Sequence, residues 1–324
     1  MTIAERPILD VDLLAFEHGS AQQRRAVVDG VLRSLATGFV FTTHDLPEDL
    51  LDEAYGMLAT FFALAPEAKA RAAAPESHGQ TGYTGLLVET AATADRPDWK
   101  EMLNWGPDLP RAHPLRHRYP AHYHDQVLPE ADVPGITAVL GTFAQQVLDI
   151  QRRFLRIVAT GLGCDQYFFD DLLVDGSHLT RAIHYPPMAS APEPGHVWAA
   201  PHTDINLITA LPRASGPGLE LLTAGGWVDV SAPPGKVIMN SGLMLERLTN
   251  GRIPAGVHRV VPPPAANTDR YSVVQFCHPA PWFVLAPLPG CVSAEHPARY
   301  GAIEAGALLE RTLWEINLIP ADGG

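Results

Sequence analysis

The sequence of 324 residues predicts an α+β fold with a mainly β core. Segments with the helical spacing of apolar residues lie mostly in the first half, whereas short alternating segments crowd into the second half. The chain also contains 30 Pro and 27 Gly, which favours many turns between short strands. Helices followed by a dense run of strands are typical of α+β proteins, so we expect the strands to curl into a barrel or a double sheet.

The expected helices are defined by apolar stripes and by capping residues. Ser20 precedes the first amphipathic stretch and is expected to cap it, and Gly38 is expected to end it. The longest stretch, 134–162, carries apolar residues at helical spacing and is expected to be the helix against which the β core packs. Helices are predicted over 21–36, 47–63, 66–74 and 134–162, with one turn at 243–248 and a closing helix within 298–318 that includes Ile316 on its apolar face.

The expected strands are short segments of alternating polar and apolar residues bounded by Gly, Pro or Asn. In such a strand, side chains two positions apart share one face. Strands are predicted over 8–13, 38–43, near Tyr83, 99–105, 179–185, 200–211, 217–222, 226–230, 237–240, around His258 and over 269–278.

Composition restricts the class of protein. The formal net charge of −13 argues against nucleic acid and anionic membranes as partners. No apolar run approaches the length of a membrane span, and no basic segment followed by an apolar one marks a signal peptide near the N-terminus. Three scattered cysteines do not suggest a disulfide framework. We therefore expect a cytoplasmic protein.

Segment 200–211 contains a candidate metal site. Its alternation predicts that His202, Asp204 and Asn206 point the same way, which would place an imidazole beside a carboxylate. A buried histidine hydrogen-bonded to an aspartate would give the same pattern. His258, in a later β-like run, supplies a third ligand, and two histidines with one carboxylate form the facial triad of non-haem Fe(II) oxygenases. A zinc site with the same three ligands remains open.

Segment 269–278 contains a candidate carboxylate site. A strand here would place Arg270, Ser272, Val274, Phe276 and His278 on one face. A guanidinium binds a carboxylate through two hydrogen bonds, and a nearby hydroxyl can add a third. The same Arg-x-Ser pattern occurs at 213–215, but there it precedes Gly-Pro-Gly and is expected to form a turn.

At this point the chain resembles the isopenicillin N synthase-like branch of the Fe(II)- and 2-oxoglutarate-dependent oxygenases. The resemblance covers nearly the whole length and depends on the order and spacing of several short motifs. Besides the residues above, these motifs are Arg-Pro-Ile-Leu-Asp-Val-Asp at 6–12, Thr-Gly-Phe-Val-Phe-Thr at 37–42, Phe-Phe-Ala-Leu-Ala-Pro-Glu-Ala-Lys at 61–69, Thr-Gly-Tyr-Thr at 81–84, Trp-Lys-Glu-Met at 99–102, His-Tyr-Pro-Pro at 184–187 and Leu-Thr-Asn-Gly at 248–251.

The resemblance implies a double-stranded β-helix, the jelly-roll architecture, flanked by N-terminal and central helices. It implies one oxygenase domain over 1–324, with a mainly helical part at 1–165, the jelly-roll core at 166–298 and a C-terminal helix at 299–324. The implied cofactor is Fe(II), with 2-oxoglutarate and O₂ as cosubstrates. The implied reaction hydroxylates a C–H bond of a small molecule and releases succinate and CO₂.

The family also implies roles for individual residues. Arg270 and Ser272 would hold the far carboxylate of 2-oxoglutarate, to which Tyr185 would donate its hydroxyl. Arg181 would reach a substrate carboxylate, or else serve as a structural ion-pair partner. Ile183 departs from plant-type members, which carry Asn there, and this loses one polar contact.

The remaining substrate-binding candidates are expected to line a mostly apolar pocket, with core packing as the alternative for each. They are Met102, Asn104, Trp198, Asn206, Phe276 and His278. Such a pocket suits an amino-acid-like molecule or a natural-product intermediate. A related enzyme that uses no 2-oxoglutarate, such as isopenicillin N synthase or an aminocyclopropane-carboxylate oxidase, remains an alternative, because those enzymes also keep Arg-x-Ser. The oligomeric state is not predicted.

Overall fold

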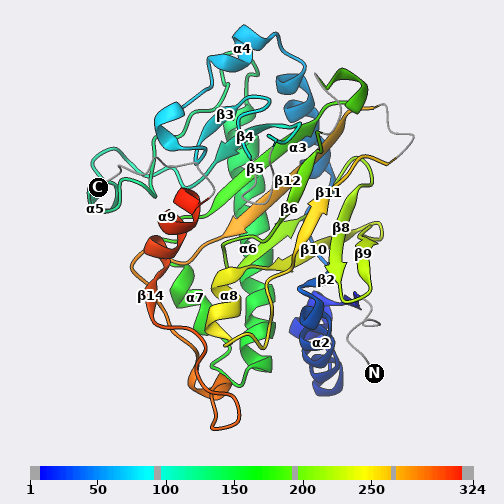
Figure 1. The fold of residues 1–324 in the computed structure, drawn as a ribbon, viewed down its shortest axis with the longest axis vertical. Coiled ribbons are helices and arrows are strands. Elements are labelled where there is room, and N and C mark those ends of the chain that lie inside the picture. Colours follow the sequence, from blue (N-terminus) through cyan, green and yellow to red (C-terminus); the bar gives the residue numbers. More distant parts are fainter. Residues whose placement is uncertain (1–7, 91–95, 192–195, 264–267, 316–324) are drawn as a thin grey trace.

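The computed structural model describes residues 8–90, 96–191, 196–263 and 268–315 (Figure 1). Its helices are α1 (Leu13–His18), α2 (Ala21–Ser34), α3 (Glu48–Phe62), α4 (Pro66–Ala70), α5 (Pro114–Arg118), α6 (Ile136–Gly161), α7 (Phe168–Leu173), α8 (Leu243–Leu248) and α9 (Ala305–Glu315). Its strands are β1 (Asp10–Val11), β2 (Phe39–Thr43), β3 (Gly82–Thr84), β4 (Glu101–Trp105), β5 (Leu179–Tyr185), β6 (Ala199–His202), β7 (Ile208–Leu211), β8 (Leu219–Thr223), β9 (Gly226–Asp229), β10 (Lys236–Ser241), β11 (His258–Val260), β12 (Arg270–Cys277), β13 (Val284–Leu285) and β14 (Ile303–Glu304).

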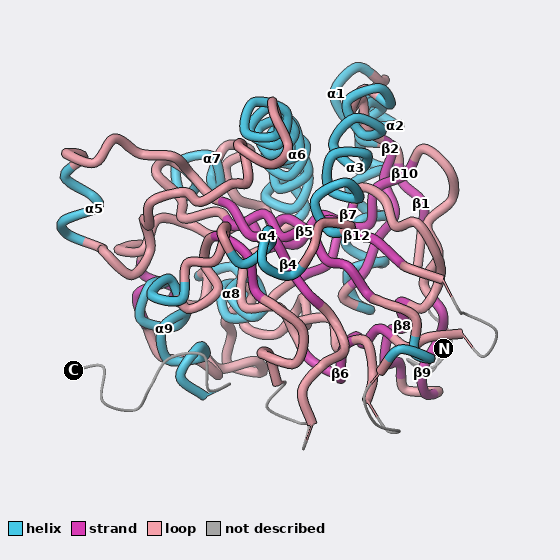
Figure 2. Tube along the Cα trace, turned by 90° about the horizontal axis from the view of Figure 1, so that it is seen from above, coloured by secondary structure: helices cyan, strands magenta, loops and turns pink. Residues whose placement is uncertain are grey.

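Two sheets form the β core. The large sheet has the order β1-β2-β10-β7-β12-β5-β4-β3, and the small sheet has the order β6-β11-β8-β9. Every pairing in them is antiparallel except that of β1 with β2. Figure 2 shows three layers, with α2, α3, α6 and α7 on one face of the large sheet and the small sheet on the other. The expected helix-flanked jelly roll is confirmed, and strands of the N-terminal part join its large sheet.

The long helix α6 packs on the large sheet as expected. Its stripe of Ile136, Leu140, Phe143, Val147, Ile150 and Phe154 is buried in one cluster with residues from both the helices and the sheet. Truncating one of these phenylalanines to Ala would cost about 3–5 kcal/mol, because the packed surroundings cannot close the cavity. The buried Gln151 amide also donates to the carbonyls of Ile208 and Gln275, on β7 and β12. The helix therefore holds two of the central strands.

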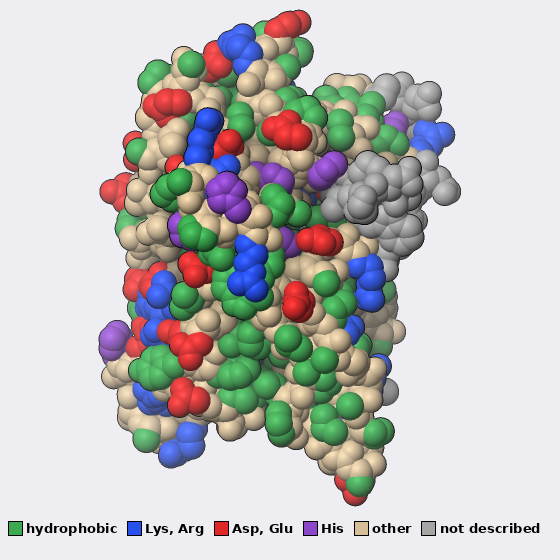
Figure 3. Space-filling view, turned by 90° about the vertical axis from the view of Figure 1, so that its left-hand side faces the viewer, with side chains coloured by type: hydrophobic (Ala, Val, Ile, Leu, Met, Phe, Trp, Pro, Cys, Tyr) green, Lys and Arg blue, Asp and Glu red, His purple; other side chains and the backbone are tan. Residues whose placement is uncertain are grey.

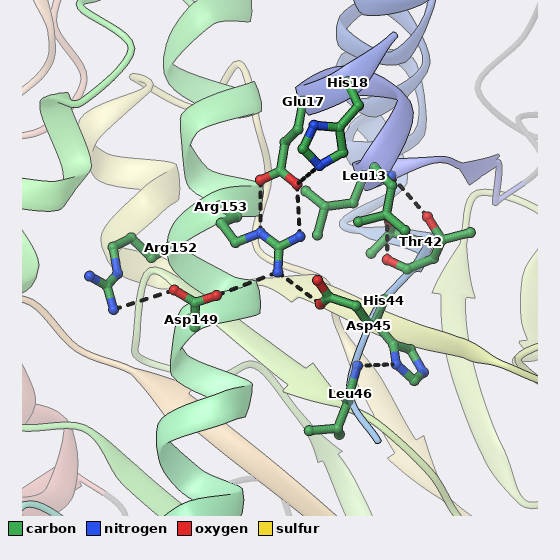
Figure 4. Close-up of polar contacts among 12 residues, drawn as sticks. Leu13, Glu17, His18, Thr42, His44, Asp45, Leu46, Asp149, Arg152 and Arg153 are labelled. Atoms are coloured by element: carbon green, nitrogen blue, oxygen red, sulfur yellow. Dashed lines mark hydrogen bonds and ion pairs between the residues drawn. The ribbon is translucent and has the colours of Figure 1, made fainter. Parts of the chain in front are cut away.

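Arg153 connects this helix to the N-terminal segment (Figure 4). Its Nε and Nη2 each donate to one Glu17 oxygen over 2.7 Å, and its Nη1 donates to Asp45 over 2.8 Å. Glu17 lies on α1 and Asp45 follows β2, so one guanidinium ties three parts of the chain together. A bidentate pair of this kind fixes geometry better than a single contact does.

The local signals at the N-terminus act partly as expected. Ser20 caps α2 in a capping box with Gln23, and Gly38 adopts the left-handed conformation (φ 85°) that ends this segment before β2. The strand predicted over 8–13 is wrong beyond Val11. Asp12 accepts hydrogen bonds from the backbone of Leu14 and Ala15, so it starts a helix where alternation alone suggested an extended chain.

The strand predicted over 200–211 is also wrong, because it is two strands in different sheets. β6 ends at His202 and pairs with β11 of the small sheet, whereas β7 begins at Ile208 and pairs with β10 and β12 of the large one. Between them the chain crosses the core, and the start of α8 satisfies its backbone, with the amides of Leu243 and Met244 donating to the carbonyls of Asp204 and Ile205. His202, Asp204 and Asn206 therefore do not share one strand face.

The closing helix α9 starts at Ala305, later than the predicted segment, and buries Leu308, Leu309 and Leu313. Ile316 and the predicted end of this helix lie outside the described residues. Among the described residues, no helix is both long and apolar enough to cross a bilayer. On the face seen in Figure 3, acidic and basic side chains are interspersed.

Candidate metal centre and cosubstrate site

The three predicted metal ligands come together between the two sheets. His202 at the end of β6 lies directly opposite His258 at the start of β11, with ring centroids 4.3 Å apart. Asp204 follows β6 in the crossing segment, and its Oδ1 lies 4.0 Å from Nε2 of His202 and 3.9 Å from Nε2 of His258. One ligand atom from each residue lies within 4.8 Å of the other two. The predicted strand over 200–211 is wrong, yet the predicted cluster forms, because Asp204 is only two residues beyond the end of β6 and stays close to His202.

Both imidazoles are held in the tautomer that a metal needs. Nδ1 of His202 lies 2.8 Å from the Ala200 carbonyl, and Nδ1 of His258 lies 3.0 Å from the Gly256 carbonyl. A carbonyl accepts only, so each Nδ1 carries the hydrogen and each Nε2 is left with its lone pair. Such partners behind a ligand fix its orientation.

The Asp204 carboxylate is oriented by its second oxygen. Oδ2 accepts hydrogen bonds from Thr209 Oγ1 at 2.5 Å and from Asn240 Nδ2 at 2.7 Å. Thr209 in turn accepts from Asn206 Nδ2 at 2.8 Å. Asn206 is fully buried outside the lining of the cavity and supports the carboxylate through Thr209, and its contact with substrate stays a prediction.

The protonation states of the His202 and Asp204 side chains favour binding of a cation. Burial and the neighbouring His258 lower the pKa of His202 to about 4. Burial would raise the pKa of Asp204, but His258, His202 and its two hydrogen-bond donors outweigh it, so the pKa falls below its ordinary value. At neutral pH the cluster therefore offers a neutral imidazole at position 202 beside a carboxylate.

The donor set fits a single metal ion. Bonds of about 2.0–2.2 Å from nitrogen and oxygen to a first-row metal allow one ion to reach atoms about 4 Å apart. Two imidazoles and one carboxylate on one side leave positions free for exchangeable ligands, which is the arrangement of non-haem Fe(II) oxygenases.

A cavity of about 410 Å³ opens beside this cluster. The predicted face of β12 is confirmed, since the five alternating residues from Arg270 to His278 all line it. The facing positions of β5, namely Arg181, Ile183 and Tyr185, line it too. The cavity is thus bounded by the metal cluster on one side and by two paired strands of the large sheet on the other.

Arg270 is held rigidly inside the cavity. Its Nε donates to the carbonyls of Gly216 and Pro217, while its Nη1 donates to Ser272 Oγ at 3.3 Å. Tyr185, its partner across the strands, places its ring 4.9 Å from the guanidinium carbon. Arg270 is 3% exposed, and among the described residues its guanidinium donates to two carbonyls and a hydroxyl but to no carboxylate. A buried cation of this kind calls for an anion.

Three other predicted substrate contacts do not line the cavity. Met102 and Trp198 are buried in the second core cluster, where Trp198 packs 5.6 Å from Tyr185 and donates to the Pro186 carbonyl. Asn104 is fully buried and accepts from Arg181 Nε at 2.7 Å. Met102 and Asn104 pair with Ile183 and Arg181 of β5, which do line the cavity, so β4 contributes from behind these two residues. Direct contact of Met102, Asn104 and Trp198 with substrate stays a prediction.

Charged residues that the sequence did not single out also line the cavity. They are Glu89, Asp98 and Lys100. Glu89 and Asp98 lie in an irregular segment between β3 and β4, so no periodicity marked them. Two signals were available for Lys100: the motif Trp-Lys-Glu-Met at 99–102, and the predicted strand over 99–105, in which Lys100 shares a face with Met102 and Asn104.

Comparisons with known proteins decide the family. The chain is 30% identical to the 2-oxoglutarate-Fe(II) type oxidoreductase ppzD of Metarhizium rileyi, over 93% of this chain and 89% of that protein. The chain belongs to the 2OG-Fe(II) oxygenase superfamily. The sequence profile of this superfamily matches residues 176–279, and that of the N-terminal region of non-haem dioxygenases in morphine synthesis matches residues 7–131.

Solved structures of the superfamily share the whole architecture. A 2OG-Fe(II) oxygenase family protein from Caulobacter crescentus is 35% identical with a TM-score of 0.84, covering 96% of this chain and 100% of that one. A full-length Neurospora crassa protein, solved in complex with α-ketoglutarate and thymine, is 26% identical with a TM-score of 0.83, covering 95% and 96%. The protein is therefore a non-haem Fe(II)- and 2-oxoglutarate-dependent dioxygenase, and Fe(II) and 2-oxoglutarate are its cofactor and cosubstrate.

Proposed function

We propose that this oxygenase hydroxylates an unactivated C–H bond of a small molecule and couples this to conversion of 2-oxoglutarate into succinate and CO₂. The single observation that carries the proposal is the position of the His202–Asp204–His258 cluster at one side of a cavity whose other side carries the buried Arg270. The relatives support a small-molecule substrate, since the Neurospora crassa protein was solved with thymine.

The geometry of the cavity supports the following proposed roles. His202, Asp204 and His258 would hold Fe(II) through Nε2, Oδ1 and Nε2. Arg270 and Ser272 would bind the far carboxylate of 2-oxoglutarate, and Tyr185 would donate its hydroxyl to it. When bound, iron supplies activation of O₂ at the expense of 2-oxoglutarate. The chain's own residues position one C–H bond and exclude bulk water.

The rest of the assignment remains prediction. We propose no nucleic acid or membrane partner, in keeping with the net charge of −13. The cytoplasmic location stays a prediction from the low cysteine content, and the single-domain division at 1–165, 166–298 and 299–324 stays a prediction as well.

The test uses the purified chain without oxygen. Addition of Fe(II) and 2-oxoglutarate should give a weak visible metal-to-ligand band, and admission of O₂ should give slow succinate release even without substrate. The band should not form when Zn²⁺ replaces Fe(II). Absence of both the band and the succinate would contradict the proposal and favour a triad enzyme that uses no 2-oxoglutarate.

A further inference from the structure

One wall of the cavity carries four charged side chains that neutralise one another. We call Glu89, Asp98, Lys100 and Arg181 the charged wall. Lys100 Nζ lies 2.5 Å from Glu89 Oε2 and 2.8 Å from Asp98 Oδ2. Arg181 Nη1 lies 3.3 Å from Glu89 Oε1. Glu89 thus bridges Lys100, just before β4, and Arg181 on β5, and two positive charges meet two negative ones.

The members of the charged wall are also held by neutral partners. Arg181 donates from Nε to Asn104 and from Nη2 to the Gly79 carbonyl, and Asp98 accepts from the Ala200 amide. Burial would raise the pKa of Glu89, yet Lys100 and Arg181 hold it at about 2. Burial would lower the pKa of Lys100, yet Glu89 and Asp98 raise it above its ordinary value. Glu89 and Lys100 are therefore both charged at neutral pH, and each lies in an ion pair of the wall.

This pairing favours the second role expected for Arg181, that of a structural ion-pair partner, over binding of a substrate carboxylate. Its guanidinium is already bound to a carboxylate, and a substrate carboxylate would have to compete with Glu89 for it. A carboxylate that lacked a cation here would be a partly buried, unpaired charge, which is strongly unfavourable. Arg181 also lies 5.5 Å over the Phe276 ring, which further fixes its position.

His278 brings a polar ring with one unpaired nitrogen to the lining of the cavity. It is 5% exposed, lines the cavity just beyond β12, and its buried Nδ1 has no hydrogen-bond partner. Burial, followed by the nearby His178 and His122, lowers its pKa to about 3, so the ring is neutral and has one donor and one acceptor nitrogen. Apolar side chains complete this end of the cavity: Val274, Phe276, Leu309 and Leu313.

We propose that the cavity takes an uncharged, largely apolar substrate that hydrogen-bonds to His278, and that the self-paired charged wall rejects molecules carrying a carboxylate. The inference rests on the proposed function, because it assumes that substrate occupies this cavity. It narrows the substrate class, since it disfavours the amino-acid-like molecules that the sequence left open.

The first test compares molecules that differ only in charge. The full chain, loaded with Fe(II) and 2-oxoglutarate without oxygen, is titrated with pairs of methyl esters and their free acids, such as methyl cinnamate with cinnamate and methyl benzoate with benzoate. Calorimetry should show the esters binding at least about tenfold more tightly than the acids. Acids that bind as tightly as their esters, or a panel in which no ester binds, would overturn the inference.

The second test uses a gain of binding, which misfolding does not produce. Glu89→Gln keeps the shape of the side chain but leaves the two cations with one anion between them. Acid binding should then strengthen by about tenfold, while ester binding changes little. The matched control is Glu17→Gln, which also removes a carboxylate paired with an arginine but lies on the helical side of the molecule (Figure 4). The same acid-to-ester ratio in wild type and Glu89→Gln would refute the role of the wall.

His278→Leu tests the hydrogen bond. The ester affinity should fall by about tenfold without a change in the affinity for 2-oxoglutarate, which binds at the other end of the cavity. An unchanged ester affinity would contradict the assigned role. The visible band separates the two proposals: if the band forms and charge discrimination is absent, only this inference fails, whereas absence of the band removes the proposed function itself.

Discussion

The metal cluster and the charged wall, two polar regions of the cavity, differ in whether their polar atoms are paired within the chain. In the metal cluster, the atoms that face the cavity are left without partners by the chain, while hydrogen bonds behind them fix their direction; Asp204 is the clearest case, with both its donors on Oδ2. In the charged wall, each charged group faces another charged group of the same chain. The first region is incomplete without external ions, and the second is complete by itself.

The difference shows how one cavity can bind charged cofactors and still prefer a neutral substrate. Arg270 and the metal ligands are available to an ion that arrives from outside, whereas the charges of the wall pair with one another among the residues that the structure describes. Buried charges are tolerated when paired. Substitutions in the first region should therefore abolish binding of a cofactor, and those in the second should change selectivity.

The largest expected effect comes from Asp204→Ala. Removal of the only carboxylate of the cluster should abolish activity and most of the bound iron, measured by metal analysis of protein purified and loaded anaerobically. Asp98→Asn is the matched comparison, since it removes a carboxylate from the same cavity but from the charged wall. The iron content of Asp98→Asn should stay close to that of the wild type. A similar loss of iron in both variants would contradict the different roles assigned to the metal cluster and the charged wall.

Arg270→Ala should raise the KM for 2-oxoglutarate by about 100-fold, because a charge-assisted bidentate contact is lost, while iron content stays near normal. Steady-state kinetics and metal analysis measure the two effects. Arg213→Ala provides the control, because Arg213 belongs to the other Arg-x-Ser pattern and pairs with Glu48 and Asp52 away from the metal. Iron loss without a change in KM would show that Arg270 does not bind the cosubstrate.

Asn240→Ala tests the support behind the metal ligand. Loss of a donor to Asp204 Oδ2 should weaken Fe(II) affinity by about 10–100-fold, measured by competition with a chelator. Asn104→Ala removes an amide of the same kind that supports Arg181 instead, and it should leave iron affinity unchanged. Equal losses in the two variants would point to general destabilisation.

The smallest effect concerns pH and stability. Burial lowers the pKa of His178 to about 4, below its unfolded value, so its stabilising contribution is full above the unfolded pKa and declines as the pH falls towards the folded one. Between about pH 7 and about pH 5.5 the free energy of unfolding should fall by about 1 kcal/mol through this group.

Urea unfolding of the wild type at these two pH values measures the decline in the free energy of unfolding. In His178→Gln this decline should be smaller by about 1 kcal/mol. Glu89→Gln should show the wild-type decline, since the pKa of Glu89, about 2, lies below the tested range. A decline that is equally steep in wild type and His178→Gln would contradict the assignment.

The sequence by itself determined much of the architecture and the chemical identity of the site. Capping at Ser20, the apolar stripe of α6 and the alternation of β12 are local patterns, and local sterics and burial are enough to read them. The same alternation placed Arg270, Ser272, Phe276 and His278 on one face, and the structure confirms that this face lines the cavity. Residue types and the family resemblance predicted His202, Asp204 and His258 as a cluster, and the structure brings these three side chains together.

Only the tertiary structure decided which partners the polar side chains hydrogen-bond to. Asn206 alternates with Asp204 in sequence, but the crossing from the small sheet to the large one turns it away from the cavity and towards Thr209. Glu89 lies in a segment without periodicity and gains its role from Lys100, just before β4, and from Arg181 on the neighbouring strand β5. A sequence pattern indicates which face a residue occupies within one helix or strand. Charge pairing instead depends on which elements lie next to one another, and the packing of the two sheets fixes that.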